Sequence, residues 1–103
     1  MTGDRTLLYL SRQDVESLAL PMTEVIAAVE GAFREKGNGT AEMPPKPGVH
    51  PLPDAFIHAM PAFLGRMGAA GLKWVSGFPQ NQAQGLPYIS GLSLNLGLRV
   101  RDP

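Results

Sequence analysis

The alternation of apolar and polar residues divides the chain into a helical first third and a strand-rich remainder. Residues 6–10 (TLLYL) form a short apolar run between polar neighbours, which predicts a strand. Ser11 stands three residues before Asp14, so residues 11–18 predict a short helix that starts with a capping box. We expect this helix to bury its two apolar side chains, Val15 and Leu18.

A long helix is the strongest prediction along the chain. Pro21 suits a first helical position, and apolar residues then recur at spacings of three and four. They are Met22, Val25, Ile26, Val29, Ala32 and Phe33. The sequence KGNG ends the helix, because Lys36 favours a helix C-terminus and Gly37 or Gly39 can adopt the left-handed cap conformation.

The rest of the chain predicts strands. Residues 44–53 hold five of the ten prolines, which indicates a long connection or an edge strand. In the strand expected over residues 55–64, one face carries Phe56, His58 and Met60, and the other carries Ile57 and Ala59. Residues 70–78 and 86–96 predict two further strands, joined by the polar loop 79–85.

We therefore predict one α+β domain over residues 1–103, without a Rossmann domain. A small mixed or antiparallel sheet would pack against one long and one short helix.

Composition excludes several classes of function. The 103 residues contain nine Lys and Arg against nine Asp and Glu, so no overall charge attracts nucleic acid or an acidic membrane. There is no cysteine, and His50 and His58 lack the spacing of helical metal ligands, so we expect no metal site. The start of the chain is too polar for a secretory signal or a membrane span, and we expect a cytoplasmic protein.

Glycine-rich residues 65–71 (GRMGAAG) follow a predicted strand and suggest a phosphate-binding loop. Their spacing is G-x-x-G-x-x-G and they lead into a strand, whereas a dinucleotide loop needs G-x-G-x-x-G before a helix. A turn between strands is therefore the better interpretation.

Lys73 is the most unusual candidate residue, because it lies within an apolar strand. Gly71, Val75 and Gly77 share its face, and the glycines would leave space for an anionic ligand. The alternative is a lysine that reaches solvent or has a structural partner. Lys46 is either a second cation for a carboxylate or a solvated loop charge.

Two other features carry weaker functional hypotheses. His58 is a candidate general base or, alternatively, a half-buried core residue. The amides of residues 78–91 either cap turns or orient a ligand.

The sequence resembles the N-terminal part of the ornithine cyclodeaminase / mu-crystallin family. The residues that carry the resemblance are LYLSRQDVESL, AAVEGAF, MPPKP, FIHAMPAFLGRMGAAGLKWVSGFPQN and GLPYISGL, between about residues 7 and 94. In that family a substrate-binding and dimerising domain is combined with a Rossmann domain that binds NAD or NADP. Ornithine cyclodeaminases, which are lyases of amino acid metabolism, convert L-ornithine to L-proline, and relatives include alanine dehydrogenases and ketimine reductases.

The resemblance implies roles for three residues. Lys73 matches the catalytic, substrate-binding lysine, Lys46 matches a position where the family usually has a carboxylate-binding arginine, and Met60 helps to line the pocket. Residues 95–103 form a divergent tail in place of the family's usual continuation.

We expect from this resemblance a truncated, homodimeric family member that binds a small amino or imino acid and is inactive alone. No NAD or NADP is expected to bind this chain by itself. The alternative is a noncatalytic dimerisation or small-molecule-binding module.

Overall fold

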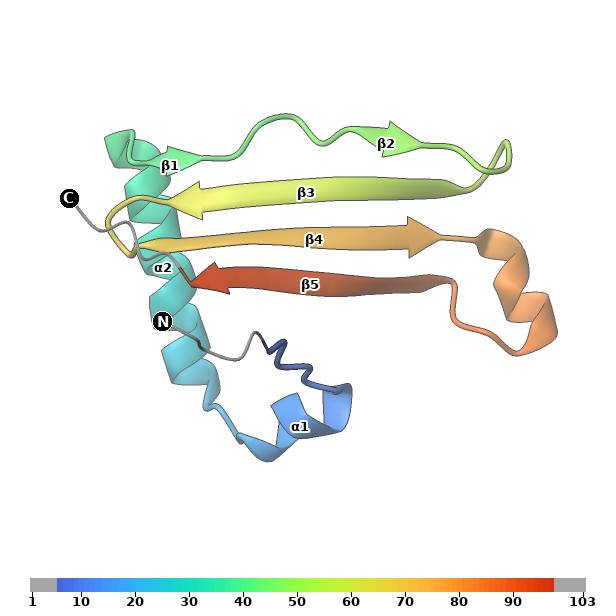
Figure 1. Cartoon of the computed structure of the whole chain (residues 1–103), viewed down its shortest axis with the longest axis horizontal. Helices are drawn as coiled ribbons and strands as arrows, with labels where there is room; N and C mark the ends of the chain where they lie inside the picture. Colours follow the sequence, from blue (N-terminus) through green and yellow to red (C-terminus); the bar gives the residue numbers. More distant parts are fainter. Residues whose placement is uncertain (1–5, 98–103) are drawn as a thin grey trace. The chain divides into compact units, whose positions relative to one another are not determined.

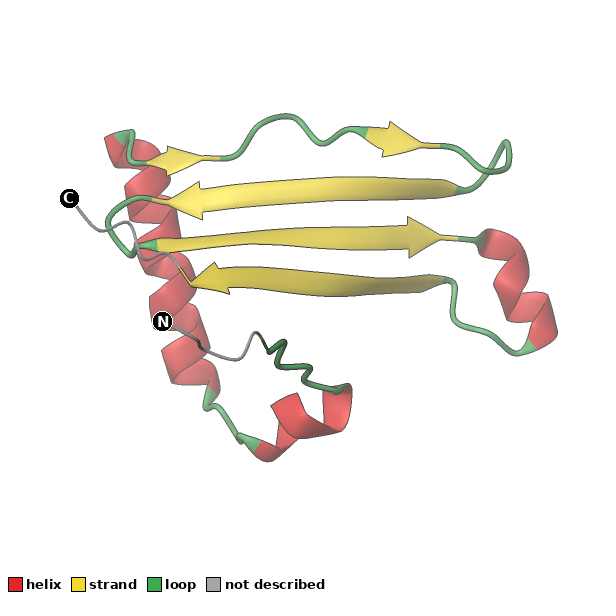
Figure 2. Cartoon of the chain, viewed as in Figure 1, coloured by secondary structure: helices red, strands yellow, loops and turns green. Residues whose placement is uncertain are grey.

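The structure is a computed structural model of the chain, and it describes residues 6–97. The chain divides into two units, Met1–Gly31 and Ala32–Pro103. Figure 1 shows the helices of the first part of the chain and the antiparallel strands that follow. Figure 2 marks the same elements by type, and the α+β class with an antiparallel sheet is confirmed.

Helix α1 (Arg12–Ser17) begins with the predicted capping box. The Ser11 hydroxyl accepts a hydrogen bond from the Asp14 N–H at 3.1 Å, and the Asp14 carboxylate accepts one from the Ser11 N–H at 2.9 Å. Hydrogen bonds from the backbone N–H and then the hydroxyl of Ser11 lower the pKa of Asp14. The predicted helix is confirmed, and its N-terminus is set by local hydrogen bonds alone.

Two predictions for this region are wrong. Residues 6–10 form no strand, because they pair with no other strand among the described residues. Val15 and Leu18 are exposed, so α1 buries neither of its apolar side chains. A short apolar run indicates that its side chains favour burial, but it does not identify the segment that would bury them.

Helix α2 (Met22–Asn38) is confirmed over the predicted range. Gly39 ends it in the left-handed conformation, with φ of 80°. The Thr40 N–H bonds to the Glu35 carbonyl at 2.9 Å and the Gly39 N–H to the Lys36 carbonyl at 3.3 Å, which is a Schellman motif. Of the two glycines proposed for this cap, Gly39 forms it and Gly37 lies within the helix.

Five antiparallel strands follow: β1 (Ala41–Glu42), β2 (Gly48–Val49), β3 (Phe56–Leu64), β4 (Ala69–Gly77) and β5 (Ile89–Gly97). The path through the sheet is β1-β3-β4-β5, and β2 also pairs with β3. As Figure 1 shows, β1 and β2 lie one after the other along the same edge of β3. The prolines of residues 44–53 explain the break between them, since proline cannot donate to a ladder. The predicted edge structure is confirmed.

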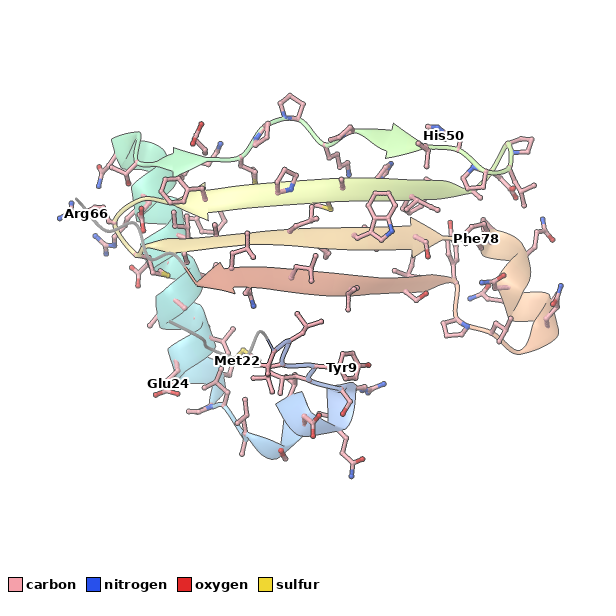
Figure 3. The ribbon with its side chains drawn as sticks, viewed as in Figure 1. Tyr9, Met22, Glu24, His50, Arg66 and Phe78 are labelled. Atoms are coloured by element: carbon pink, nitrogen blue, oxygen red, sulfur yellow. The ribbon has the colours of Figure 1, made fainter. Side chains whose placement is uncertain are left out.

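The connections before and after β4 lie at its opposite ends, where Figure 3 labels Arg66 and Phe78. A tight turn joins β3 to β4, with Gly68 at a φ of 69° and its N–H bonded to the Leu64 carbonyl at 2.9 Å. The glycine-rich segment is therefore a turn, as predicted. Between β4 and β5 the polar loop forms a 3-10 helix, η1 (Pro79–Gln84), which Gly85 ends at a φ of 75°.

Glu35 links the end of α2 to the turn between β3 and β4. Its carboxylate accepts hydrogen bonds from the Arg66 N–H at 2.7 Å, the Met67 N–H at 2.9 Å and the Thr40 hydroxyl at 3.0 Å. Burial by itself raises the pKa of Glu35, but these bonds and the Arg66 charge outweigh burial, and the pKa is lowered. Glu35 is thus an ionised, fully hydrogen-bonded buried group.

Few side chains in the described part of the chain are fully buried. Ala55 is the buried apolar residue, 1% exposed, and Glu35 is the buried charged residue, 5% exposed. Much apolar surface on the strands therefore remains available for contacts with other molecules or other protein segments.

Candidate functional site

Lys73 lies at the centre of β4 and is exposed. It stands directly opposite Met60 of β3 on one side and Ser93 of β5 on the other. Directly paired residues of antiparallel strands project to the same face, so these three side chains form one row across the sheet. The predicted strand is confirmed, and Gly71, Lys73, Val75 and Gly77 lie on one face of it as predicted. Lys73 can lie within an apolar run because its side chain is exposed.

We call the side of the sheet that carries Lys73 the lysine face. The register assigns these strand residues to it: Ala41, Gly48, Phe56, His58, Met60, Ala62, Leu64, Ala69, Gly71, Lys73, Val75, Gly77, Ile89, Gly91, Ser93, Asn95 and Gly97. None of these strand residues is an aspartate or a glutamate. Within residues 6–97, Lys73 has no ion-pair partner. An anionic ligand on this face would meet positive charge without competition from a carboxylate on these strands.

The space expected over the glycines beside Lys73 is already occupied. A Cβ at position 71 would come within 2.8 Å of the Asn95 side-chain oxygen, and a Cβ at position 77 would overlap the Phe56 ring. The glycines therefore accommodate side chains of neighbouring strands, and the prediction of open space is wrong. Asn95 borders Lys73 on this face because it pairs with Gly71, whereas Phe56 pairs with Gly77, four residues further along β4.

Lys46 lies in the connection between β1 and β2 and is exposed. The Ala59 N–H bonds to the Pro47 carbonyl at 3.0 Å, so the connection still runs along β3 at this point. Continuing the β2 alternation back from Gly48 assigns Lys46 to the lysine face, beside Met60. Two strand spacings, about 10 Å, then separate the backbones at Lys46 and Lys73.

His58 is half-buried, as predicted, and its ring stacks on Phe56. The ring centroids are 4.4 Å apart with an interplanar angle of 24°. Within residues 6–97 its imidazole nitrogens have no hydrogen-bond partner, so no acidic residue orients the ring as a general base would require. A role for His58 as a base stays a prediction.

The opposite side of the sheet, which we call the apolar face, carries large exposed side chains. They are Val49, Phe63, Trp74, Leu92, Leu94 and Leu96. Trp74 is 45% exposed and Leu96 is 70% exposed. Exposed apolar side chains gathered on one face are typical of regions that contact another molecule.

The amides of the η1 loop act mainly within the loop. The Asn81 side chain donates to the Pro87 carbonyl at 3.1 Å, and Gln80 donates to Asp54 at 3.4 Å. The Phe78 N–H bonds to the Tyr88 carbonyl at 2.9 Å and closes the loop. Asn81 therefore acts as a turn cap, one of the two readings of this segment.

The described residues contain no group of three or more metal-ligating side chains. No helix among them is long and apolar enough to cross a membrane.

Sequence reasoning missed three residues that the structure brings forward. Ser93 and Asn95 lie on the lysine face, and the alternation of serine, leucine and asparagine in residues 93–95 was a signal for it. The sequence did not indicate that Glu35 is buried, because its position in the helical pattern is typical of an exposed glutamate.

The chain matches the model of the ornithine cyclodeaminase/mu-crystallin family over residues 6–94, and it belongs to this family. It is 46% identical over 95 residues to the nodulation efficiency protein NfeD of Rhizobium meliloti, covering 92% of this chain and 28% of that protein. It is 45% identical over 87 residues to the alanine dehydrogenase of Archaeoglobus fulgidus, covering 84% of this chain and 26% of that enzyme. The chain thus spans little more than a quarter of either relative.

Solved structures show the same fold. An archaeal alanine dehydrogenase dimer with bound NAD superposes with a TM-score of 0.77 at 43% identity, covering 85% of this chain and 26% of that one. The Δ1-pyrroline-2-carboxylate reductase of Thermococcus litoralis, in complex with NADH and L-proline, gives a TM-score of 0.80 at 39% identity, covering 86% and 28%.

Proposed function

We propose that the lysine face binds the carboxylate of a small amino or imino acid, with Lys73 as its main cation. The observation that carries the proposal is an exposed lysine in mid-strand, on a face whose strand residues include no acid. Lysine is a compact point charge with three donors, which suits one carboxylate oxygen at a time. Lys46 is the second cation, and Met60 between them contacts the carbon skeleton of the ligand.

The reaction we propose is the redox chemistry of the family. Its relatives here include an alanine dehydrogenase and a pyrroline-2-carboxylate reductase whose structure holds NADH and L-proline. The family reaction expected from the resemblance, the deaminating cyclisation of L-ornithine to L-proline, belongs to the same chemistry. In each case a carboxylate lies next to the carbon whose bond to nitrogen changes. Lys73 would thus lie beside the reactive carbon as well as the carboxylate, and we propose it as the catalytic residue.

The described residues do not themselves fit a dinucleotide. The glycine-rich segment, residues 65–71, leads into strand β4, so no helix N-terminus meets a pyrophosphate there. We assign no cofactor to these residues and propose that the 103-residue chain alone binds the substrate without turning it over.

A second copy of the chain is the partner we propose for the apolar face. The archaeal alanine dehydrogenase that shares this fold is a dimer. Trp74 and Leu92 stand directly opposite each other near the middle of this face, where an aromatic anchor contributes most to binding.

A noncatalytic dimerisation module is the alternative, and the extent of the exposed apolar face favours it. Titration of the isotope-labelled chain with L-proline, followed by NMR, separates the two. Binding that depends on Lys73 supports the substrate site, whereas dimerisation without binding supports the module.

A further inference from the structure

His58 is the one ionisable side chain on the strands of the lysine face besides Lys73, and its ring is held in place. Phe56 stacks against it, and Gly48 of β2 lies so close that a Cβ at that position would overlap the imidazole Cδ2. The ring is therefore fixed between two neighbours, while its nitrogens have no hydrogen-bond partner in the described part of the chain. A fixed, half-buried donor without a partner is a suitable contact for a ligand.

The position of His58 relative to Lys73 is set by the register. His58 lies two residues from Met60, which is directly opposite Lys73, so His58 and Lys73 are diagonal neighbours on one face. Diagonal neighbours of this kind have α-carbons about 7–8 Å apart. A ligand of a few carbon atoms can therefore contact both side chains at once.

Among the described residues, the charged and titratable groups that the register assigns to this face near His58 are basic. Lys73 faces it from β4, Lys46 lies in the connection before β2, and His50 follows β2 with the same parity as Gly48 (Figure 3). The strand residues of this face include no carboxylate that could accept a hydrogen bond from the imidazole. Anions bound here would supply the missing negative charge.

We infer that His58 is a specificity-determining residue that favours ligands with two carboxylates over ligands with one. The inference rests on the proposed function, because the first carboxylate occupies the Lys73 site. The second carboxylate accepts a hydrogen bond from an N–H of the His58 imidazole, which is a charge-assisted bond because the acceptor is ionised.

Glutarate and pentanoate are matched probes, since both have five carbon atoms and differ in one carboxylate. The labelled chain is titrated with each acid, and the shifts of the Lys73 and His58 amide signals give the two dissociation constants. We expect glutarate to bind about tenfold more tightly than pentanoate, as one added charge-assisted hydrogen bond provides.

Two variants assign this preference to the imidazole. His58→Phe keeps a ring stacked on Phe56 and removes the N–H donor, and His58→Leu removes the donor if the first variant is unstable. Both should bind glutarate and pentanoate with nearly equal affinity. Pentanoate binding without a preference for glutarate in the unaltered chain would overturn the inference alone. If neither glutarate nor pentanoate binds, the proposed Lys73 site would be overturned as well.

Discussion

Met60 lies directly opposite Lys73 in the ladder between β3 and β4, so a thioether and an ammonium group project side by side from one face of the sheet. Side chains in this relationship have Cβ atoms about 4.5–5.5 Å apart. The pair offers an anion a positive charge and offers the adjoining carbon atoms a soft apolar surface. That combination matches the two ends of a small amino or imino acid.

Replacing Lys46 by arginine should tighten carboxylate binding. A guanidinium can bind both carboxylate oxygens at once, whereas an ammonium acts as a point charge. Because the position is exposed, we expect a gain of roughly two- to fivefold in affinity for L-proline, measured by NMR titration. Lys36→Arg, at the end of α2, is the matched control and should leave the affinity unchanged. Equal effects of the two variants would exclude Lys46 from the site.

Replacing Gly77 by alanine should displace the Phe56 ring, because the added Cβ would overlap it. We expect a loss of about 1–3 kcal/mol in the free energy of unfolding, as for other overpacked sites, measured by denaturant titration. Gly37→Ala is the control, since that glycine lies within α2 with open space around it. It should instead stabilise the chain by about 0.5–1 kcal/mol. A neutral Gly77→Ala variant would show that the ring does not need this space.

Glu35→Gln should destabilise the link between α2 and the β3–β4 turn, because an amide cannot accept both backbone hydrogen bonds. The pKa of Glu35 is lowered on folding, so its contribution to stability is complete above the ordinary value of 4.5 and is lost as the pH falls through the lowered value. The melting temperatures of the two forms should therefore differ most at neutral pH and converge in acid.

Glu42→Gln tests whether this effect belongs to Glu35. Glu42 is an exposed strand carboxylate, and its replacement should leave the melting temperature unchanged at every pH. A difference between unaltered chain and Glu35→Gln that stays constant from neutral to acid pH would contradict the proposed role of the carboxylate charge.

Leu92→Glu should weaken self-association of the chain. Leu92 lies on the apolar face opposite Trp74, and a second copy covering that face would bury the new charge without a partner. We expect the dimer dissociation constant, measured by sedimentation velocity, to rise at least about tenfold. Met67→Glu adds the same charge in the β3–β4 turn and should not alter association. Two variants that dimerise equally well would exclude the apolar face as the interface.

The sequence predicted elements whose boundaries are set by local chemistry. The Ser11 capping box, the glycine that ends α2 and the alternation around Lys73 depend on residues within a few positions of each other. The row formed by Met60, Lys73 and Ser93 could not be predicted, because it depends on the register of three strands and local patterns do not determine that register.

Failures of prediction occurred where the outcome depends on distant neighbours. Residues 6–10 have the composition of a strand and no partner strand in the described chain. Gly71 and Gly77 suggested open space above β4, but the side chains of Asn95 and Phe56 from the adjacent strands occupy it. In both cases tertiary contacts, or their absence, decide the result.

The most direct test of the central claim is the affinity of the chain for L-proline before and after Lys73→Ala. We predict that L-proline shifts the amide signals of Met60, Lys73 and Ser93, and that the substitution weakens binding at least about tenfold. Lys36→Ala, which removes a lysine charge at the end of α2, should bind as the unaltered chain does. Unchanged affinity in Lys73→Ala, with a preserved fold, would contradict the assignment of Lys73 as the carboxylate-binding residue.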